Sequence, residues 1–178
     1  MKVLLDEKQL ADGVRRMAAD MSAHYGDEPV TIIGALHGCI VLLADLIRQL
    51  KMPLRVGLAR ANSYRGATRS PGAVTIDLDM LPDIRGRHVL LLDDIFDTGH
   101  TMVELLNQIG DLGPSSVRSA VLLRKQGRQQ VDIRPDFFAF DIPDAFVVGY
   151  GLDFNNLYRN LPYIAVLEPH ETAEVSTA

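Results

Sequence analysis

The sequence predicts an α/β fold in which a mostly parallel sheet is flanked by helices. Short apolar segments alternate along the chain with segments whose apolar residues recur at helical spacing. The apolar segments are nearly continuous, which is typical of parallel strands covered on both faces. A chain of 178 residues can form one domain with a substantial core. We expect this domain to span residues 1–168, and we expect residues 169–178 to form a disordered tail.

The N-terminal part of the chain predicts a helix, a strand and a second helix. Apolar residues at spacings of three and four indicate an amphipathic helix over residues 7–24. Val30–Leu36 is a short apolar run that Gly38 ends, and it predicts a buried strand. The helix expected after it carries the apolar residues Ile40, Leu43, Leu46 and Leu50.

The middle of the chain predicts two strands separated by a polar loop. Leu54–Ala61 is the first strand, and Val74–Met80 is a strand that returns from the loop. The intervening segment Asn62–Gly72 (NSYRGATRSPG) is rich in glycine, serine and proline, a composition that favours a mobile loop.

The C-terminal part returns to the strand–helix pattern. His88–Asp94 (HVLLLDD) predicts a buried strand, Asp97–His100 a turn, and the next apolar residues a helix through Met102, Leu105, Leu106 and Ile109. Further strands are expected at Ser116–Leu123, Phe138–Ile142, Phe146–Tyr150 and Tyr163–Leu167. Ligands of open parallel sheets bind beyond the carboxyl ends of the strands. We therefore expect the site where loops open at Leu36, Asp93 and Leu123.

Composition and charge exclude several classes of function. The net charge of −5 argues against a general nucleic-acid binder, which needs a basic surface. No apolar run approaches the roughly 18 residues that span a bilayer, so no membrane partner is expected. Met1 is followed by charged residues and not by the apolar core of a signal peptide. Cys39 is the single cysteine, which excludes an internal disulfide. A cytoplasmic enzyme is the resulting expectation.

The segment His88–Met102 (HVLLLDDIFDTGHTM) concentrates groups suited to a phosphorylated substrate. A buried strand delivers Asp93 and Asp94 to its end, and Asp97 follows three residues later. The next four residues, Thr98, Gly99, His100 and Thr101, open a helix. Unpaired amides at a helix start favour an anion, glycine allows close approach, and threonine hydroxyls add donors. In isolation, Asp97 or Thr98 could be an ordinary helix cap and the acidic pair a solvated strand end.

The order of these groups resembles the signature of the type I phosphoribosyltransferases: an apolar strand, two acidic residues, two apolar residues, Asp-Thr-Gly and a helix. Segments outside this signature resemble the hypoxanthine-guanine branch of that family: Gly34–Gly38, Ser63-Tyr64, Leu123–Lys125, Pro135–Phe137, Ile142–Asp153 and Tyr158–Tyr163. The resemblance implies the type I phosphoribosyltransferase fold, with a small hood and a mobile lid loop. It also implies transfer of a 5-phosphoribosyl group from phosphoribosyl pyrophosphate to hypoxanthine or guanine.

The resemblance assigns roles around the sugar and the phosphates. Asp93 and Asp94 are expected to hold the ribose hydroxyls directly or through Mg²⁺, and Asp153 to reach a second Mg²⁺ near the base. Asp97 resembles the general base that takes the proton from purine N7. The turn Thr98–Thr101, including Gly99 and His100, is expected to bind the 5′-phosphate.

Further roles concern the base and the leaving group. Lys125 resembles the donor to purine O6, Phe146 the aromatic that stacks on the base, and Val147 the residue whose backbone pairs with the base edge. Lysine offers only donors, so it favours a 6-oxo group over the 6-amino group of adenine. Read alone, Lys125 could be a surface lysine in the basic run Arg124–Arg128, and Phe146 a core residue.

Pyrophosphate is expected to contact Arg159 and the loop His37-Gly38, whose backbone in the family contains a non-proline cis peptide. Ser63 and Tyr64 resemble the tip of the lid. The family often has basic residues where this chain has His37 and His100, so the contribution of these two side chains is open. The resemblance suggests a homodimer or homotetramer.

Three alternatives remain at the level of sequence. A regulator with the same fold would need a basic face or an added DNA-binding domain, and neither is present in this sequence. A xanthine-preferring transferase would share the 6-oxopurine contacts, whereas a pyrimidine enzyme lacks the set of Lys125, Phe146 and Asp153. A plain phosphate-binding α/β domain leaves the three carboxylates of Asp93, Asp94 and Asp97 without a role.

Overall fold

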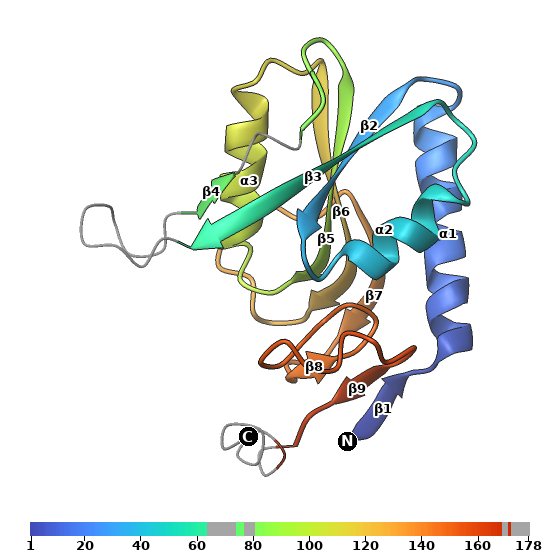
Figure 1. Cartoon of the computed structure of the whole chain (residues 1–178), viewed down its shortest axis with the longest axis vertical. Helices are drawn as coiled ribbons and strands as arrows, with labels where there is room; N and C mark the ends of the chain where they lie inside the picture. Colours follow the sequence, from blue (N-terminus) through green and yellow to red (C-terminus); the bar gives the residue numbers. More distant parts are fainter. Residues whose placement is uncertain (64–73, 77–80, 169–170, 172–178) are drawn as a thin grey trace, which may run out of the picture.

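The computed structural model describes residues 1–63, 74–76, 81–168 and 171 of the chain. The bounds of its strands and helices are β1 Lys2–Leu5, α1 Glu7–Tyr25, β2 Val30–Leu36, α2 Ile40–Ile47, β3 Leu54–Ser63, β4 Val74–Ile76, β5 His88–Phe96, α3 His100–Gly110, β6 Ser116–Lys125, β7 Phe137–Ile142, β8 Val147–Val148 and β9 Ile164–Val166. Strands and helices alternate from β1 to α2, and helix α3 then stands between the strands β3–β5 and the strands β6–β9 (Figure 1).

The central sheet has the strand order β4-β3-β2-β5-β6-β7. The five strands β3, β2, β5, β6 and β7 are parallel, and the short β4 is antiparallel to β3. The chain runs outward from β2 to β3 and then returns to place β5 on the other side of β2. This reversal forms a topological switch point between β2 and β5, where sheets of this kind bind their ligands. The predicted α/β fold with a mostly parallel sheet is confirmed.

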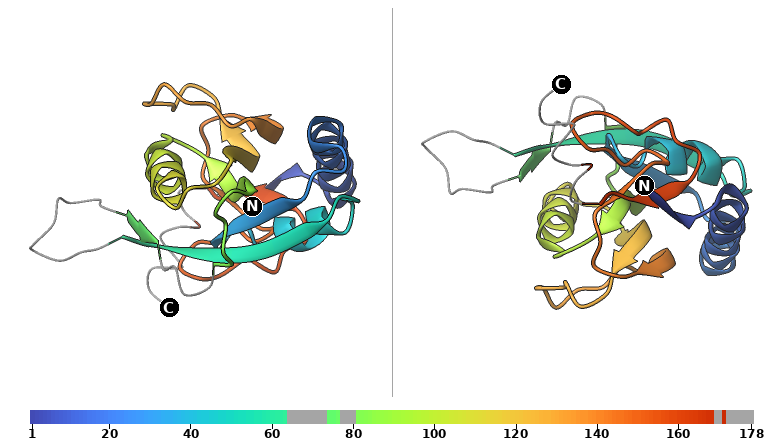
Figure 2. Two further views of the ribbon diagram at one scale, coloured as in Figure 1. Left: turned by 90° about the horizontal axis from the view of Figure 1, so that it is seen from above. Right: turned by 90° about the horizontal axis from the view of Figure 1, so that it is seen from below.

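Helices cover both faces of the sheet (Figure 2). On one face, α1 and α2 bury their apolar residues against the inward-facing side chains of alternate strand positions, such as Ile32, Leu90 and Leu122. On the other face, α3 packs Met102, Leu105 and Ile109 against the intervening positions, such as Leu91 and Val121. This division follows from strand geometry, because successive side chains point to opposite faces of a strand. Both faces are apolar, which accounts for the continuous hydrophobic runs in the sequence.

A second sheet of three antiparallel strands, in the order β1-β9-β8, lies beyond the carboxyl ends of the parallel strands (Figure 1). Its position over the expected site is that of the small hood. The N-terminal strand β1, which the sequence reading missed, pairs with β9 through Lys2 and Val166 and through Val3 and Ala165. Asp6 then begins α1: its side chain accepts from the Gln9 amide at 2.8 Å, and the Gln9 side chain accepts from the Asp6 amide at 2.9 Å. This reciprocal cap fixes the direction in which α1 leaves the hood.

Several predicted element bounds were wrong by a few residues. Helix α2 ends at Ile47, so Leu50 lies beyond it, because Gln49 donates to the Leu46 carbonyl at 2.9 Å in a tighter closing turn. Strand β5 continues to Phe96 because its pairing with β6 extends to Ile95 and Phe96. Asp93 and Asp94 therefore lie inside the strand and not at its end.

Strand β3 extends through Ser63, which pairs with Val74, so the polar loop begins later than Asn62. The predicted strands at 146–150 and 163–167 are shorter in the structure. The predicted strand at 74–80 is described only over Val74–Ile76, and its remainder lies outside the described residues. Residues 64–73, 77–80 and the tail beyond Glu168, except Glu171, lie outside the described part. In the part of the chain that the structure describes, no helix combines the length and apolar character needed to cross a membrane.

Candidate active site

Two cavities lie side by side at the carboxyl ends of the parallel strands, on the side of the hood. The first has a volume of about 260 Å³ and is formed by β5, the following turn and the start of α3. Its lining residues are Asp93, Asp94, Ile95, Phe96, Asp97, Thr98, Gly99, Thr101 and Met102. The second has a volume of about 240 Å³ and is lined by Asp94, Ile95, Asp97, Lys125, Phe146, Val147, Leu152 and Asp153. Asp94, Ile95 and Asp97 belong to both, so the two cavities adjoin.

The turn between β5 and α3 shapes the first cavity. Gly99 has a φ of 91°, and a Cβ there would lie 2.3 Å from Val131 Cγ2 and 2.8 Å from the Phe96 ring. Only glycine satisfies both the positive φ and this close approach. The Val103 amide donates to the Gly99 carbonyl at 3.0 Å, which leaves the amides of the first turn of α3 without partners inside the helix. These amides, with Thr98 and Thr101, make the first cavity suited to an anion.

His100 is part of the same turn but its side chain is exposed and does not line the cavity. Its Nε2 atom lies 3.1 Å from Gln130 Oε1, on the loop that follows β6. Of the four residues Thr98–Thr101, the structure thus brings Thr98, Gly99 and Thr101 to the cavity and directs the imidazole of His100 away from it.

Asp93 lines the first cavity, and its neighbour Asp94 lines both. The Asp94 amide donates to Asp93 Oδ1 at 2.9 Å. Burial and the charge of Asp94 raise the pKa of Asp93 well above its usual value, and burial raises the pKa of Asp94. Gly38 packs directly against Asp94, because a Cβ on Gly38 would lie 1.4 Å from Asp94 Oδ2. The end of β2 and the carboxylates of β5 therefore meet at the switch point.

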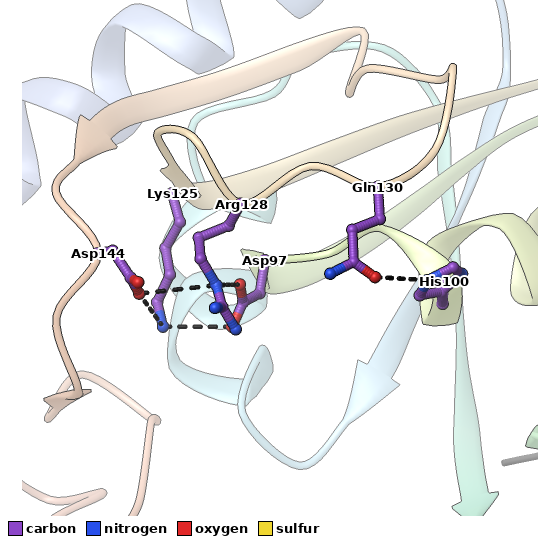
Figure 3. A network of polar contacts seen from close by, with 6 residues as sticks. All are labelled: Asp97, His100, Lys125, Arg128, Gln130 and Asp144. Carbon is purple, nitrogen blue, oxygen red and sulfur yellow. Dashed lines mark hydrogen bonds and ion pairs between the residues drawn. The ribbon is translucent and has the colours of Figure 1, made fainter.

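A charged cluster connects the two cavities (Figure 3). Lys125 Nζ lies 3.2 Å from Asp97 Oδ2, and Arg128 Nε lies 3.0 Å from Asp97 Oδ1. Both cations are also 3.7 Å from Asp144 Oδ1. Partial burial alone raises the pKa of Asp97, but the hydrogen bonds and charges of Arg128 and Lys125 outweigh it, and the net pKa is lowered. Asp97 is therefore ionised over the neutral pH range and oriented by two cations.

The second cavity joins the four residues predicted to contact a purine. Lys125, whose side chain is 11% exposed, extends from the end of β6, and Val147 begins β8. Phe146 is exposed and contacts Phe154 edge to face, with ring centroids 5.4 Å apart. An aromatic face, a backbone strand and a buried ammonium group around one cavity suit a flat heterocycle with an acceptor on its edge.

Arg159 and Asp153 form an ion pair in the loop that leads from β8 to β9. Arg159 Nη2 lies 2.8 Å from Asp153 Oδ1, and Nη1 donates to the Gly151 carbonyl at 2.8 Å. The other oxygen of Asp153 accepts from the Asn156 amide at 2.8 Å. The positive charge of Arg159 also lowers the pKa of Asp94, which partly offsets the effect of burial. Arg159 does not line either cavity in this arrangement, whereas Asp153 lines the second.

The Leu36–His37 peptide bond is cis, as the family resemblance implied. The side chain of His37 is exposed and does not line either cavity, whereas the Gly38 backbone lies against Asp94. Ser63 ends β3, and its side chain is not described. Tyr64, the other residue predicted at the tip of the lid, lies outside the described residues.

Three residues of the charged cluster and its surroundings escaped the sequence reading: Arg128, Gln130 and Asp144. Arg128 stood in a basic run that is typical of a solvated surface. The signal that could have found it is Gly127, because glycine soon after a strand indicates a tight turn, and the φ of this residue is 72°. Asp144 lies directly before the predicted base-binding segment, and its two cationic neighbours come from the end of β6 and from the loop that follows it, so spacing alone does not reveal the contact.

The carboxylates offer oxygen ligands of the kind that Mg²⁺ prefers. Within the described residues, no group of three or more His, Cys, Asp or Glu side chains is arranged to hold a metal by itself. A cation that keeps several waters and bridges substrate oxygens needs only one or two protein carboxylates. Asp93 and Asp94 meet that requirement, since they lie next to the anion-binding turn. Asp153 faces the second cavity and is the remaining candidate.

Taken together, the five-stranded parallel sheet, the hood, the turn suited to an anion and the acidic pair define a phosphoribosyltransferase of type I. The chain belongs to the phosphoribosyl transferase domain family, whose model matches residues 1–155. The chain is 37% identical over 167 residues to a hypoxanthine-guanine phosphoribosyltransferase of Streptococcus pneumoniae, covering 94% of this chain and 93% of the relative. It is 38% identical over 168 residues to that of Bacillus subtilis, with coverage of 94% and 93%.

Solved structures agree with this assignment. A hypoxanthine phosphoribosyl transferase of Trypanosoma cruzi superposes with a TM-score of 0.91 at 34% identity, covering all of this chain and 96% of that one. A hypoxanthine-guanine phosphoribosyltransferase of Bacillus anthracis, with a HEPES molecule in its active site, gives a TM-score of 0.88 at 34% identity. It covers 94% of this chain and 99% of that chain.

Proposed function

We propose that the protein is a purine-salvage enzyme that transfers the 5-phosphoribosyl group of phosphoribosyl pyrophosphate to hypoxanthine or guanine. The observation that carries this proposal is the adjoining pair of cavities. One presents a helix start for a phosphate, and the other presents Lys125, Phe146 and Val147 for a purine. Asp97 lines both. The names of the relatives support the same activity.

On the base side, Lys125 Nζ donates to purine O6 and Phe146 stacks on the ring. Because Asp97 Oδ2 lies 3.2 Å from Lys125 Nζ, a base held through O6 brings its neighbouring N7 toward Asp97. Purine N9 attacks C1 of the sugar while the bond from C1 to the pyrophosphate oxygen breaks. The bonding electrons leave with pyrophosphate, and the N7 proton passes to Asp97 as general base.

On the sugar side, the amides of the 98–101 turn bind the 5′-phosphate, and Asp93 with Asp94 binds the ribose hydroxyls. Positive charge grows on the sugar in the transition state, and the negative charge of the two carboxylates stabilises it. Their raised pKa values reflect the cost of holding two charges in one buried place. That cost falls when Mg²⁺, or the positive charge that develops on the sugar, lies next to the two carboxylates.

We propose Mg²⁺ as the cofactor, held by Asp93 and Asp94, with Asp153 reaching a second ion. When bound there, Mg²⁺ would supply Lewis-acid charge neutralisation for the pyrophosphate that leaves. The protein residues meanwhile orient the two substrates. Arg159 pairs with Asp153 at 2.8 Å and is the nearest described cation available for pyrophosphate on this loop. Its planar guanidinium group suits a phosphate oxygen pair.

The proposal is tested by initial-rate assays with hypoxanthine, guanine, xanthine and adenine, each with phosphoribosyl pyrophosphate and Mg²⁺. Turnover with hypoxanthine or guanine and little with adenine is the expected outcome. Turnover with xanthine alone would replace the proposed substrates, and turnover with none of the four would reject the assignment. A parallel assay with a chelator tests the Mg²⁺ requirement, because full activity without metal contradicts it.

We also propose that the enzyme is a homodimer or homotetramer and works in the cytoplasm on small molecules. Ile40 on α2 and Val56 on β3 are exposed apolar side chains that a second copy could cover. The single, buried thiol of Cys39 suits a reducing compartment. Light scattering of the purified chain tests the assembly: a mass near 19.6 kDa would show a monomer.

A further inference from the structure

The loop that follows β6 lies against the turn that precedes α3. The Gln130 amide donates to the Thr98 carbonyl at 3.0 Å, and Gln130 Oε1 lies 3.1 Å from His100 Nε2. The side chain of Val131 occupies the space above Gly99, where a Cβ would lie 2.3 Å from it. These contacts place Arg128, which lies in the same loop, beside Asp97 (Figure 3).

The two oxygens of the Asp97 carboxylate have different partners. Oδ1 accepts from Arg128 Nε at 3.0 Å, and Oδ2 accepts from Lys125 Nζ at 3.2 Å. The two cations come from different places, because Lys125 extends from the end of β6 and lines the second cavity, whereas Arg128 does not line it. Oδ2 is therefore the oxygen on the side of the base, and Oδ1 is held from the opposite, loop side.

We propose that Arg128 is a positioning residue for the transfer reaction: it holds Asp97 through Oδ1 so that Oδ2 is aimed at the N7 proton of the bound purine. This inference rests on the proposed function. When a 6-oxopurine enters, Lys125 turns its ammonium group to O6 and loosens its contact with Oδ2. Arg128 then remains as the cation that fixes the carboxylate, and Oδ2 is free to accept the proton.

The charged groups around Asp97 support separate roles for Lys125 and Arg128. Asp97 faces Lys125 and Arg128, Asp144 lies 3.7 Å from both cations, and Asp94 and Asp153 line the same cavity. Arg128 offsets the repulsion that these acidic neighbours exert on an ionised Asp97. The hydrogen bond from Arg128 is also the largest of the effects that lower the pKa of Asp97. Without Arg128, Asp97 should take up a proton at a higher pH and lose its ability to act as a base there.

The test compares the parent enzyme with Arg128→Ala and Arg128→Lys, and uses Arg134→Ala as the control. Arg134 is an exposed arginine farther along the same loop. Single-turnover formation of inosine monophosphate from hypoxanthine isolates the chemical step from product release. Equilibrium binding of phosphoribosyl pyrophosphate with Mg²⁺ is measured in parallel, together with the melting temperature of each variant.

We expect Arg128→Ala to lower the single-turnover rate about tenfold, the effect of losing one charge-assisted contact in a half-exposed place. Affinity for phosphoribosyl pyrophosphate should stay within about twofold of the parent. The acid limb of the rate profile should move to higher pH. Arg128→Lys should recover most of the rate, because an ammonium group can still donate to Oδ1, and Arg134→Ala should match the parent.

Parent-like single-turnover rates in Arg128→Ala would overturn the positioning role and show that the contact between Arg128 and Asp97 matters only in the ligand-free enzyme. An equal loss in rate and in phosphoribosyl pyrophosphate affinity, without recovery in Arg128→Lys, would overturn it in favour of a structural role for the loop. Absence of turnover in the parent itself would instead reject the proposed function.

Discussion

Arg159 and Asp153 neutralise each other across 2.8 Å in the loop between β8 and β9. The two residues are assigned to different ligands, pyrophosphate and a metal ion near the base. Lys125 and Asp97 form a second pair of this kind at 3.2 Å. In the absence of ligands, both of these cations thus have a partner of opposite sign. Neither Arg159 nor Lys125 therefore carries an unpaired charge in the ligand-free site. When ligands bind, each of the two cations exchanges its aspartate for a ligand group.

Because Arg159 is expected to exchange Asp153 for pyrophosphate, its replacement should weaken the binding of phosphoribosyl pyrophosphate. Arg159→Ala should raise the Michaelis constant for phosphoribosyl pyrophosphate by about 10–100-fold, because it removes a charge-assisted and bidentate donor. His37→Ala is the comparison: its exposed imidazole can contribute one neutral hydrogen bond, so the increase should be about tenfold or less. Steady-state kinetics at neutral pH decide between them, with melting temperatures as a check on folding. A larger effect for His37→Ala would contradict the roles assigned to both residues.

Lys125 predicts discrimination against adenine. The Lys125 side chain is 11% exposed and its ammonium group offers only donors, so a 6-amino group leaves it unpaired. Adenine should be used about 10⁴-fold less efficiently than hypoxanthine. Lys125→Ala should lower activity with hypoxanthine and narrow this gap, which initial rates with both bases measure. Adenine turnover equal to that of guanine in the parent would show that Lys125 does not read the 6-position.

Asp97 predicts a loss of turnover without a loss of sugar binding. Asp97→Asn keeps the size of the side chain but removes the proton acceptor, so turnover should fall by about 10²–10⁴-fold. Affinity for phosphoribosyl pyrophosphate should change little, because Thr98 and Thr101 remain in place. Calorimetric binding and steady-state rates test the two halves of this statement. Near-parent turnover in the variant would remove Asp97 from the role of base.

The raised pKa of Asp93 predicts that Asp93→Asn stabilises the ligand-free protein, although the same substitution should inactivate the enzyme. Burial, and then the charge of Asp94, raise the pKa of Asp93 above its unfolded value of about 4. Protonation therefore favours the folded state, and the contribution of Asp93 to the free energy of unfolding falls as pH rises through the unfolded and folded pKa values. Asp93→Asn should therefore stabilise the ligand-free protein at pH 8 and raise its melting temperature by about a few degrees.

The gain from Asp93→Asn should shrink as the pH is lowered, because the raised pKa lets the parent carboxyl take up a proton at a higher pH than an ordinary aspartate does. Thermal melts at pH 8 and at a lower pH measure it, and Asp132→Asn, which changes an exposed carboxylate, is the control. A variant that melts below the parent at both pH values would contradict the raised pKa of Asp93.

Most of the fold was predictable because its signals are local. The buried strand Val30–Leu36 and the helix over residues 7–24 follow from apolar periodicity and were placed within a residue. Strand β1 was missed because four half-exposed residues carry no such pattern, and their pairing with β9 is a contact across the whole chain. The continuation of β5 to Phe96 was missed for the same reason, since pairing with β6 determines it.

The site was predictable to the extent that its residues form contiguous motifs. The sequence placed Asp93, Asp94, Asp97 and Lys125 in one site, and the cavities contain all four. His100 was expected in the phosphate-binding turn, with the contribution of its side chain left open. Its imidazole lies against Gln130, because the loop after β6 offers it a partner outside the cavity. Arg128 was not singled out, since its contact with Asp97 joins two loops that only the folded sheet brings together.

The stoichiometry of the reaction tests the proposed transfer most directly. Purified enzyme is incubated with hypoxanthine, phosphoribosyl pyrophosphate and Mg²⁺, and the bases, nucleotides and pyrophosphate are quantified over time. We predict one inosine monophosphate and one pyrophosphate for each hypoxanthine consumed, with no products after chelation of the metal. Consumption of phosphoribosyl pyrophosphate without loss of hypoxanthine, or no consumption of either, would contradict the transfer.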